Sequence, residues 1–142
     1  MTVLAMGLGC ATPKPRGADG EGLRAAAERF HRLVRWGDLR SAFQGLVPQQ
    51  RLRAMKEALE RKDDEALKVL DYDIVDARND GDHAVVLSKI SWHRLPSTVV
   101  RTDAVTLDFV ARDGAWLIRA IEGGPLPLPA PAADEAPPAA SR

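Results

Sequence analysis

Several features that usually reveal a protein's chemistry are missing from this sequence of 142 residues. One cysteine and three histidines give no metal-site spacing, and no glycine-rich loop of the phosphate-binding kind is present. The 20 basic and 20 acidic residues cancel, whereas nucleic-acid binders normally carry a basic surface. No apolar run approaches the ~20 residues that a helix needs to cross a bilayer. We therefore expect no metal, no cofactor and no nucleic-acid partner.

The lone cysteine, Cys10, excludes a disulfide within the chain. It ends a short apolar run, residues 3–9, and the stretch Gly7-Leu8-Gly9-Cys10 resembles the lipobox of bacterial lipoproteins. The resemblance implies that the Cys10 thiol carries a lipid and that the protein is exported and membrane-anchored in the cell envelope, facing the periplasm. No lysine or arginine precedes Cys10, although a signal peptide normally opens with one. A cytoplasmic protein whose first residues imitate a signal is therefore the alternative.

Composition divides the chain into four parts. Residues 1–10 form the signal-like segment, and residues 11–21, rich in proline, glycine and small residues, are typical of a flexible tether. Residues 22–124 have the size of one domain. Residues 125–142 contain six prolines, which lack an amide hydrogen and fix φ. We expect this Pro/Ala-rich tail to be disordered or partly polyproline II, and to join neither a sheet nor a helix.

The first half of the predicted domain has the apolar spacing of helices. Gly37 is suited to end a first helix, Asp38 to cap a second, and Pro48 to occupy the first turn of a third. Asp63 or Asp64 could cap one further short turn. The apolar positions expected to face the core, at three- and four-residue spacing, are Leu23, Ala26, Ala27, Phe30, Leu33 and Val34, then Leu39, Ala42, Phe43 and Leu46, then Leu52, Met55, Ala58 and Leu59, and in the last turn Ala66, Leu67 and Leu70.

The second half changes to alternation with period two, which predicts strands. Asn, Asp and Gly in residues 79–82, and Asp-Gly in residues 112–114, are hairpin signals because these residue types tolerate φ > 0. We expect about four antiparallel strands, including a long one from about Thr98 to Ala111. Helices followed by such a meander form an α+β arrangement, with the helices covering the concave face of a curved sheet.

Three local motifs resemble those of nuclear-transport-factor-2-like domains, in the order and spacing of that family. They are Gly37-Asp38-Leu39 after the first helix, residues 81–86 (Gly-Asp-His-Ala-Val-Val) after the hairpin, and residues 113–118 (Asp-Gly-Ala-Trp-Leu-Ile) at the end. The resemblance covers residues 21–122, and together with the lipobox it matches small bacterial lipoproteins of unknown function. It implies a cystatin-like cone, which is a bent sheet wrapped on helices around a pocket, and a possible homodimer through the sheet face.

In such a cone, side chains at inward strand positions would line the pocket. The candidates are Tyr72, His83, Trp92, Asp103 and Phe109. Related isomerases and dehydratases use Asp or His as a base and Tyr or Asp as an oxyanion donor in such cavities. Asp103 shares a strand phase with Phe109 and would be desolvated if that phase faces inward. A solvated strand carboxylate is the alternative for Asp103.

The remaining polar and aromatic residues indicate no catalytic or metal site. His83 and His93 lie too far apart on one strand to share a metal, and Ser41 has no adjacent base. We expect His31 at the boundary of the core. The three tryptophans are expected in the core or at its edge, with ligand stacking as the alternative for Trp92: Trp36, Trp92 and Trp116.

We therefore predict a non-catalytic cell-envelope lipoprotein domain that binds a partner protein or a small apolar ligand. One alternative is an enzyme that performs acid-base chemistry in a closed cavity, and another is a cytoplasmic protein of the same fold. An enzyme should bury a carboxylate or histidine beside a polar neighbour in a pocket. A partner-binding module should have a filled interior and an exposed apolar patch on the sheet. The expected partners also include the membrane, through the lipid anchor.

Overall fold

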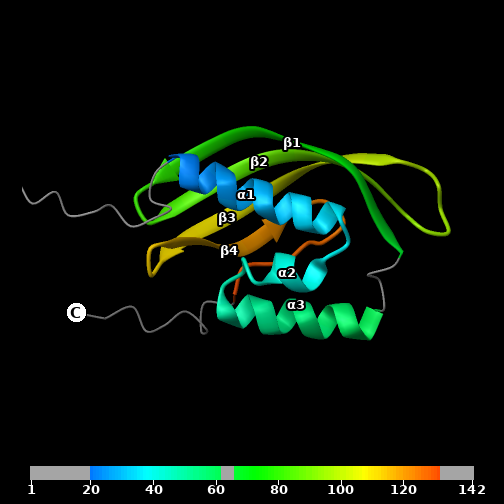
Figure 1. The fold of residues 1–142 in the computed structure, drawn as a ribbon, viewed down its shortest axis with the longest axis horizontal. Coiled ribbons are helices and arrows are strands. Elements are labelled where there is room, and N and C mark those ends of the chain that lie inside the picture. Colours follow the sequence, from blue (N-terminus) through cyan, green and yellow to red (C-terminus); the bar gives the residue numbers. More distant parts are fainter. Residues whose placement is uncertain (1–19, 62–65, 132–142) are drawn as a thin grey trace, which may run out of the picture.

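Three helices precede a four-stranded antiparallel sheet in the computed structural model, which describes residues 20–61 and 66–131 (Figure 1). The helices are α1 (Gly20–Arg35), α2 (Leu39–Phe43) and α3 (Pro48–Arg61), and the strands are β1 (Leu67–Asp80), β2 (His83–Arg94), β3 (Arg101–Arg112) and β4 (Ala115–Glu122). The strands are neighbours in chain order. The predicted α+β arrangement, helices followed by a four-stranded meander, is therefore confirmed. Cys10, Asp63 and Asp64 lie outside the described residues.

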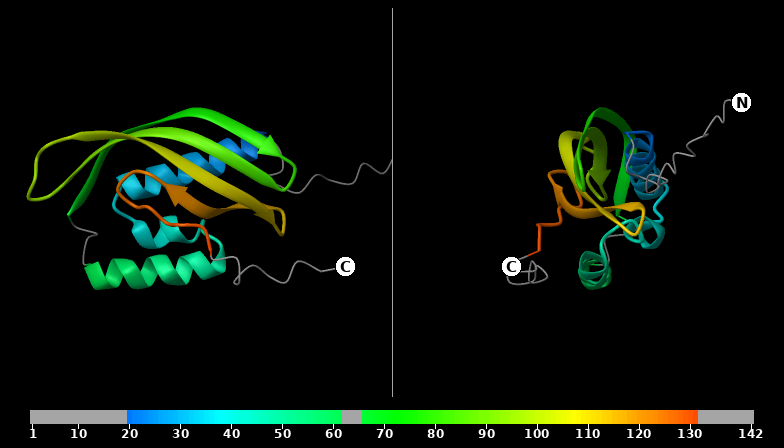
Figure 2. Two further views of the ribbon diagram at one scale, coloured as in Figure 1. Left: turned by 180° about the vertical axis from the view of Figure 1, so that it is seen from behind. Right: turned by 90° about the vertical axis from the view of Figure 1, so that its left-hand side faces the viewer.

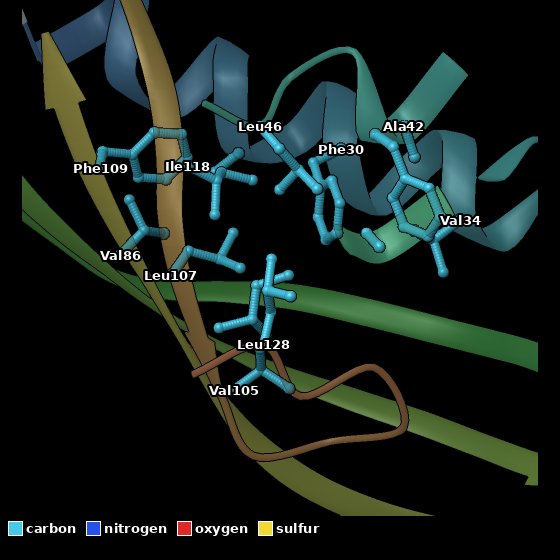
Figure 3. Packing of buried hydrophobic residues seen from close by; sticks show 14 of the residues in the cluster. Phe30, Val34, Ala42, Leu46, Val86, Val105, Leu107, Phe109, Ile118 and Leu128 are labelled. Carbon is cyan, nitrogen blue, oxygen red and sulfur yellow. The ribbon is translucent and has the colours of Figure 1, made fainter. Parts of the chain in front are cut away.

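The core lies between α1, α2 and the inner face of the sheet. α1 runs along the sheet, and α2 follows beneath its C-terminal end (Figures 1 and 2). Phe30 from α1 and Leu46 after α2 belong to one buried cluster with Leu107 and Ile118 of the strands (Figure 3). Burial of a side chain of this size contributes about 1.5–3 kcal/mol, so these contacts dominate the stability of the fold.

Both predicted hairpin turns are present. Gly81 has φ of +64° between β1 and β2. Asp113 and Gly114 have φ of +51° and +77° between β3 and β4, which is the mirror-image turn that matches the twist of paired strands. The long strand predicted from Thr98 begins later, at Arg101.

β1 begins at Leu67, so the short helical turn predicted for residues 66–70 is wrong. Leu67 and Val69 are buried, but the alternation then shifts, because the pairing with β2 has irregularities at Leu70 and again at Val75. Each of these β-bulges adds one residue, so Leu70 is 44% exposed instead of facing inward. Bulges on this outer strand also make it a poor template for a further strand.

α3 is oriented differently from the prediction. Leu52 and Leu59 are each 75% exposed, whereas Gln50 and Ala54 are buried. The amide Nε2 of Gln50 donates hydrogen bonds to the carbonyl oxygens of Arg119 and Pro129, both at 2.7 Å. This polar side chain faces inward because it satisfies two carbonyl groups that a leucine could not satisfy.

The outer edge of β4 is covered by two other segments. Val47 N–H donates to the carbonyl of Ile118, and Ile118 N–H donates to the carbonyl of Gly45. Farther along, Ile121 and Leu128 exchange two backbone hydrogen bonds of 2.8 Å each. Residues 123–131, which we call the C-terminal strap, therefore pack along the edge of the sheet (Figure 2).

The strap differs from the expectation that the chain is disordered beyond residue 124 and cannot join a sheet. Leu128 is 3% exposed and supplies both the N–H and the C=O that face β4. Pro127 and Pro129 fall at the alternate positions, whose backbone groups point away from β4, so their missing N–H groups cost no ladder bond. Proline at every second position therefore allows Leu128 to pair with β4, while the outer side of the strap offers no N–H group at Pro127 and Pro129 to a further strand.

Two aromatic side chains lie elsewhere than predicted. Trp36, expected in the core or at its edge, is 78% exposed because it follows the last residue of α1, where the chain turns at Gly37 (φ +77°). His31, expected at the boundary, is 1% exposed. It faces Ser88 of β2, a buried polar partner that the sequence pattern did not reveal.

Candidate functional site

The five candidate pocket residues do not gather at one site, and only Trp92 and Asp103 are hydrogen-bonded to each other. Phe109 is a core residue, Tyr72 is half-buried against α1, and His83 is exposed at the start of β2. Trp92 and Asp103 meet, since the indole Nε1 donates to Oδ2 of Asp103 at 2.8 Å. Trp92 and Asp103 occupy inward-facing positions of β2 and β3, as expected. However, Tyr72, His83, Trp92 and Asp103 line none of the three cavities described below.

A histidine beside a hydroxyl group is buried between α1 and β2. His31 Nε2 lies 2.9 Å from Ser88 Oγ, and the imidazole stacks on Tyr72 with ring centroids 5.4 Å apart. Burial lowers the pKa of His31 to about 4, which keeps the ring neutral. In the described part of the chain, Nδ1 has no hydrogen-bond partner, so no carboxylate orients this ring. Both side chains are at most 1% exposed, and a substrate cannot reach the hydroxyl group.

A mainly apolar pocket lies between α3, α2 and the C-terminal strap. We call it the α3 pocket. About 480 Å³ of atom-free space lies in and in front of it, open solvent included, and about 30 Å³ of this can hold the centre of a water molecule; the lining residues come from six segments of the chain. Its lining is Leu39, Phe43 and Leu46, Ala54, Glu57 and Ala58, Leu67, Arg94, Ile121, and Leu126, Pro127 and Leu128. Ten of these twelve residues carry apolar side chains, so the pocket favours an apolar group over water.

The width of the α3 pocket depends on α3. Ala54 and Ala58 present small side chains toward it, and this leaves space between the helix and the sheet. α3 is fixed to the sheet near its N-terminal end, where Gln50 binds two carbonyl groups and Arg51 Nη2 donates to Gln44 and Leu46 carbonyls. The pocket lies under the following turns of the helix, so a small tilt about the N-terminal end would widen it.

Two charged side chains border the α3 pocket. Arg94 Nη2 donates to the carbonyl oxygen of Pro125 at 3.1 Å, which ties the end of β2 to the strap. Glu57 accepts from Arg53 at 3.4 Å on the surface of α3. A carboxylate and a guanidinium on the same rim give no net preference for a charged ligand. The polar end of a neutral ligand can instead form a hydrogen bond with the carboxylate as acceptor or with the guanidinium as donor.

Sequence reasoning missed most of this pocket. Ala54 was not among the expected inner positions of α3, and Leu126 and Leu128 were assigned to a disordered tail. The available signal was the alternation of leucine and proline over residues 125–129, which is period two and therefore typical of a strand.

Two further cavities are less suited to an apolar ligand. One, of about 500 Å³ with open solvent included, lies between α1, α2 and β4 and includes Arg29, Ser41 and Gln44 in its lining. The other, of about 1000 Å³, is an open groove on the outer face between the sheet and the strap. Its lining includes Asp108 and Glu122, and Arg119 Nη2 pairs with Asp108 at 3.1 Å. Charged groups at the surface of this groove keep it well hydrated.

Residues 20–61 and 66–131 contain no candidate for two other types of site. No group of three His, Cys, Asp or Glu side chains is arranged to hold a metal ion within these ranges. No helix there combines the length and the apolar character needed to span a membrane.

No protein-family model matches the chain, and no curated protein matches it. Among solved structures, the fold is similar to the solution structure of a SEC-C motif containing protein from Rhodopseudomonas palustris. The TM-score is 0.61 over 78% of this chain and 82% of that chain, with 14% sequence identity. At this identity the likeness shows the fold alone.

This finding corrects the resemblance to small nuclear-transport-factor-2-like lipoproteins, which is wrong: the structure reported above as similar is that of a SEC-C motif containing protein. The motifs that suggested the resemblance have local causes. Gly37 ends α1 with φ of +77°, Asp38 Oδ1 caps α2 by accepting from Ser41 N–H, and Asp113-Gly114 forms a hairpin turn. Such turns recur in many unrelated α+β domains, so they indicate element boundaries and not a family.

Proposed function

We propose that this domain is a non-catalytic binding module that takes up a small, neutral, apolar molecule in the α3 pocket. The supporting observation is the convergence of α2, α3, three strands and the strap on one apolar pocket that borders the buried core. A neutral ligand fits best because Glu57 and Arg94 offset each other at the rim.

An enzymatic role has less support. The buried His31–Ser88 pair is the strongest arrangement of catalytic residue types, yet neither residue lines the α3 pocket. A general base must reach the proton that it removes, directly or through one water molecule. His31 satisfies Ser88 inside the core instead, which is a structural role.

The proposal is tested by titrating the full chain with 1-hexanol and following methyl NMR signals of the α3 pocket. Ala58→Leu, at the half-buried rim, and Ala54→Leu, deeper in, place extra methyl groups in the space that the ligand would use. We expect both variants to weaken 1-hexanol binding at least tenfold. Ala25→Leu, at an exposed position of α1, is the matched control and should leave binding unchanged.

The melting temperature of each variant shows whether the fold is intact. Ala54→Leu is more able to disturb packing, because Ala54 is 7% exposed. If Ala54→Leu lowers the melting temperature, the 1-hexanol affinity of Ala58→Leu alone tests the proposal. A folded Ala58→Leu variant that binds 1-hexanol as well as the wild type would contradict the proposal.

A further inference from the structure

The hairpin between β2 and β3 projects beyond the helices and ends in an apolar tip. Both strands extend past α1 and α3 at this end of the molecule (Figure 1 and left panel of Figure 2). The tip carries Leu95, Val99 and Val100, which are 44%, 69% and 51% exposed. Single exposed aliphatic residues are ordinary, but three at one projecting tip indicate contact with an apolar phase.

The base of this hairpin holds a tryptophan between two arginines. The guanidinium carbons of Arg94 and Arg101 each lie 5.9 Å from the centroid of the Trp92 ring. The indole N–H is anchored on Asp103, and Ser91 Oγ lies 3.1 Å from Thr102 Oγ1 on the neighbouring pair of residues. These contacts fix the two strands directly behind the tip, so the tip is presented by a rigid base.

The charged side chains between Trp92 and Thr102 have one sign, and the nearest carboxylate, that of Asp103, accepts the indole N–H. Residues 92–102 include two arginines and a histidine and contain no acidic residue. Arg101 is exposed, whereas Arg94 is half-buried and donates to the carbonyl of Pro125. Arg101 is therefore the cation most accessible to an anionic partner.

We propose that this hairpin docks on an anionic lipid bilayer, with Leu95, Val99 and Val100 entering the boundary of the acyl chains. From tip to base, the small side chains of Pro96, Ser97 and Thr98 at the turn are followed by the aliphatic side chains and then by indole and guanidinium. This order matches the order of a bilayer surface, since acyl chains accept the aliphatic groups while Trp and Arg favour the headgroup region. Arg101 adds attraction to anionic headgroups, which extends over about a Debye length.

The test uses a fluorescent reporter on the tip of the full chain. In a Cys10→Ser background, Val99→Cys is labelled with the environment-sensitive dye NBD and mixed with phosphatidylcholine vesicles that contain or lack phosphatidylglycerol. A second protein labelled at Leu59→Cys is the matched control, because Leu59 is 75% exposed on α3 and is not part of the hairpin. We expect a blue shift and a several-fold rise in emission at position 99 with anionic vesicles, and no change at position 59.

Unlabelled variants separate the apolar and the electrostatic contributions to vesicle binding. Val100→Asp should reduce sedimentation with anionic vesicles at least tenfold, whereas Leu52→Asp, at an exposed position of α3, should not. Arg101→Gln and added salt should both weaken sedimentation. The inference is overturned if position 99 shows no shift, if positions 99 and 59 shift equally, or if vesicles without phosphatidylglycerol bind as well. A shift at position 99 that grows with protein concentration alone would assign the tip to a protein contact and would also overturn it.

Discussion

At the scale of single residues, His31 makes the stability of the fold depend on pH. Its pKa is lowered from 6.5 to about 4, because burial disfavours the charged imidazolium. The unfolded chain therefore binds a proton at higher pH than the folded chain does. Stability is fully present above pH 6.5 and falls as the pH decreases from 6.5 toward 4, by about 3 kcal/mol in total for this one group.

Urea unfolding of the wild type and of His31→Gln between pH 7.5 and pH 4 measures this effect. Glutamine does not titrate, and its amide can still bond to Ser88. We expect the variant to be less stable than the wild type at pH 7.5 and to lose less stability on acidification, so the two curves approach each other. Parallel curves would show that His31 is not the group responsible.

Gln50 illustrates what single residues hide from sequence analysis. A glutamine on a helix of mixed polarity is normally solvent-exposed, and nothing in the spacing of α3 singles it out. It is buried because two carbonyl groups, on β4 and on the strap, need a donor at the point where α3 begins. Such a requirement exists only after the segments have come together, so the sequence alone could not reveal it.

At the scale of elements, the strap is expected to depend on this anchor. Gln50→Leu removes the donor for Arg119 and Pro129 and should lower the free energy of unfolding by about 2 kcal/mol. Hydrogen exchange at the Leu128 amide should become faster, because the strap is then held chiefly by its pair with Ile121. Gln49→Leu, at an exposed neighbouring position, is the control. Equal exchange rates in both variants would contradict an anchoring role for Gln50.

The type and order of the elements could be predicted because periodicity is a local property. The apolar stripe of α1, the stop at Gly37, the cap at Asp38 and the two hairpin turns each depend on neighbouring residues. The orientation of α3 could not be predicted in the same way. Leu52, Met55 and Leu59 make a plausible stripe, but α3 packs on α2 and the strap, which leaves Leu52 and Leu59 in water.

At the scale of the whole molecule, sequence reasoning predicted the packing of α1 on the sheet but not the candidate site. The apolar face of α1 has one large apolar partner, the inner face of the strands, so Phe30 and Leu107 belong to the same buried cluster. The α3 pocket, by contrast, requires the strap to return along β4 and close one side. Its walls come from segments far apart in the chain. The prolines of residues 125–131 predicted a disordered tail, not a segment that pairs with β4.

The most direct test of the proposed function is an isotope-filtered NOE experiment on the full chain with 1-hexanol. We expect NOEs from the alkyl chain of 1-hexanol to the methyl groups of Ala58, Leu67 and Leu126, which lie on α3, β1 and the strap. Contacts to all three would place the ligand inside the α3 pocket. NOEs confined to Val85 and Leu87 on the outer face or to Val99 and Val100 on the hairpin tip, or no NOEs at all, would contradict the account.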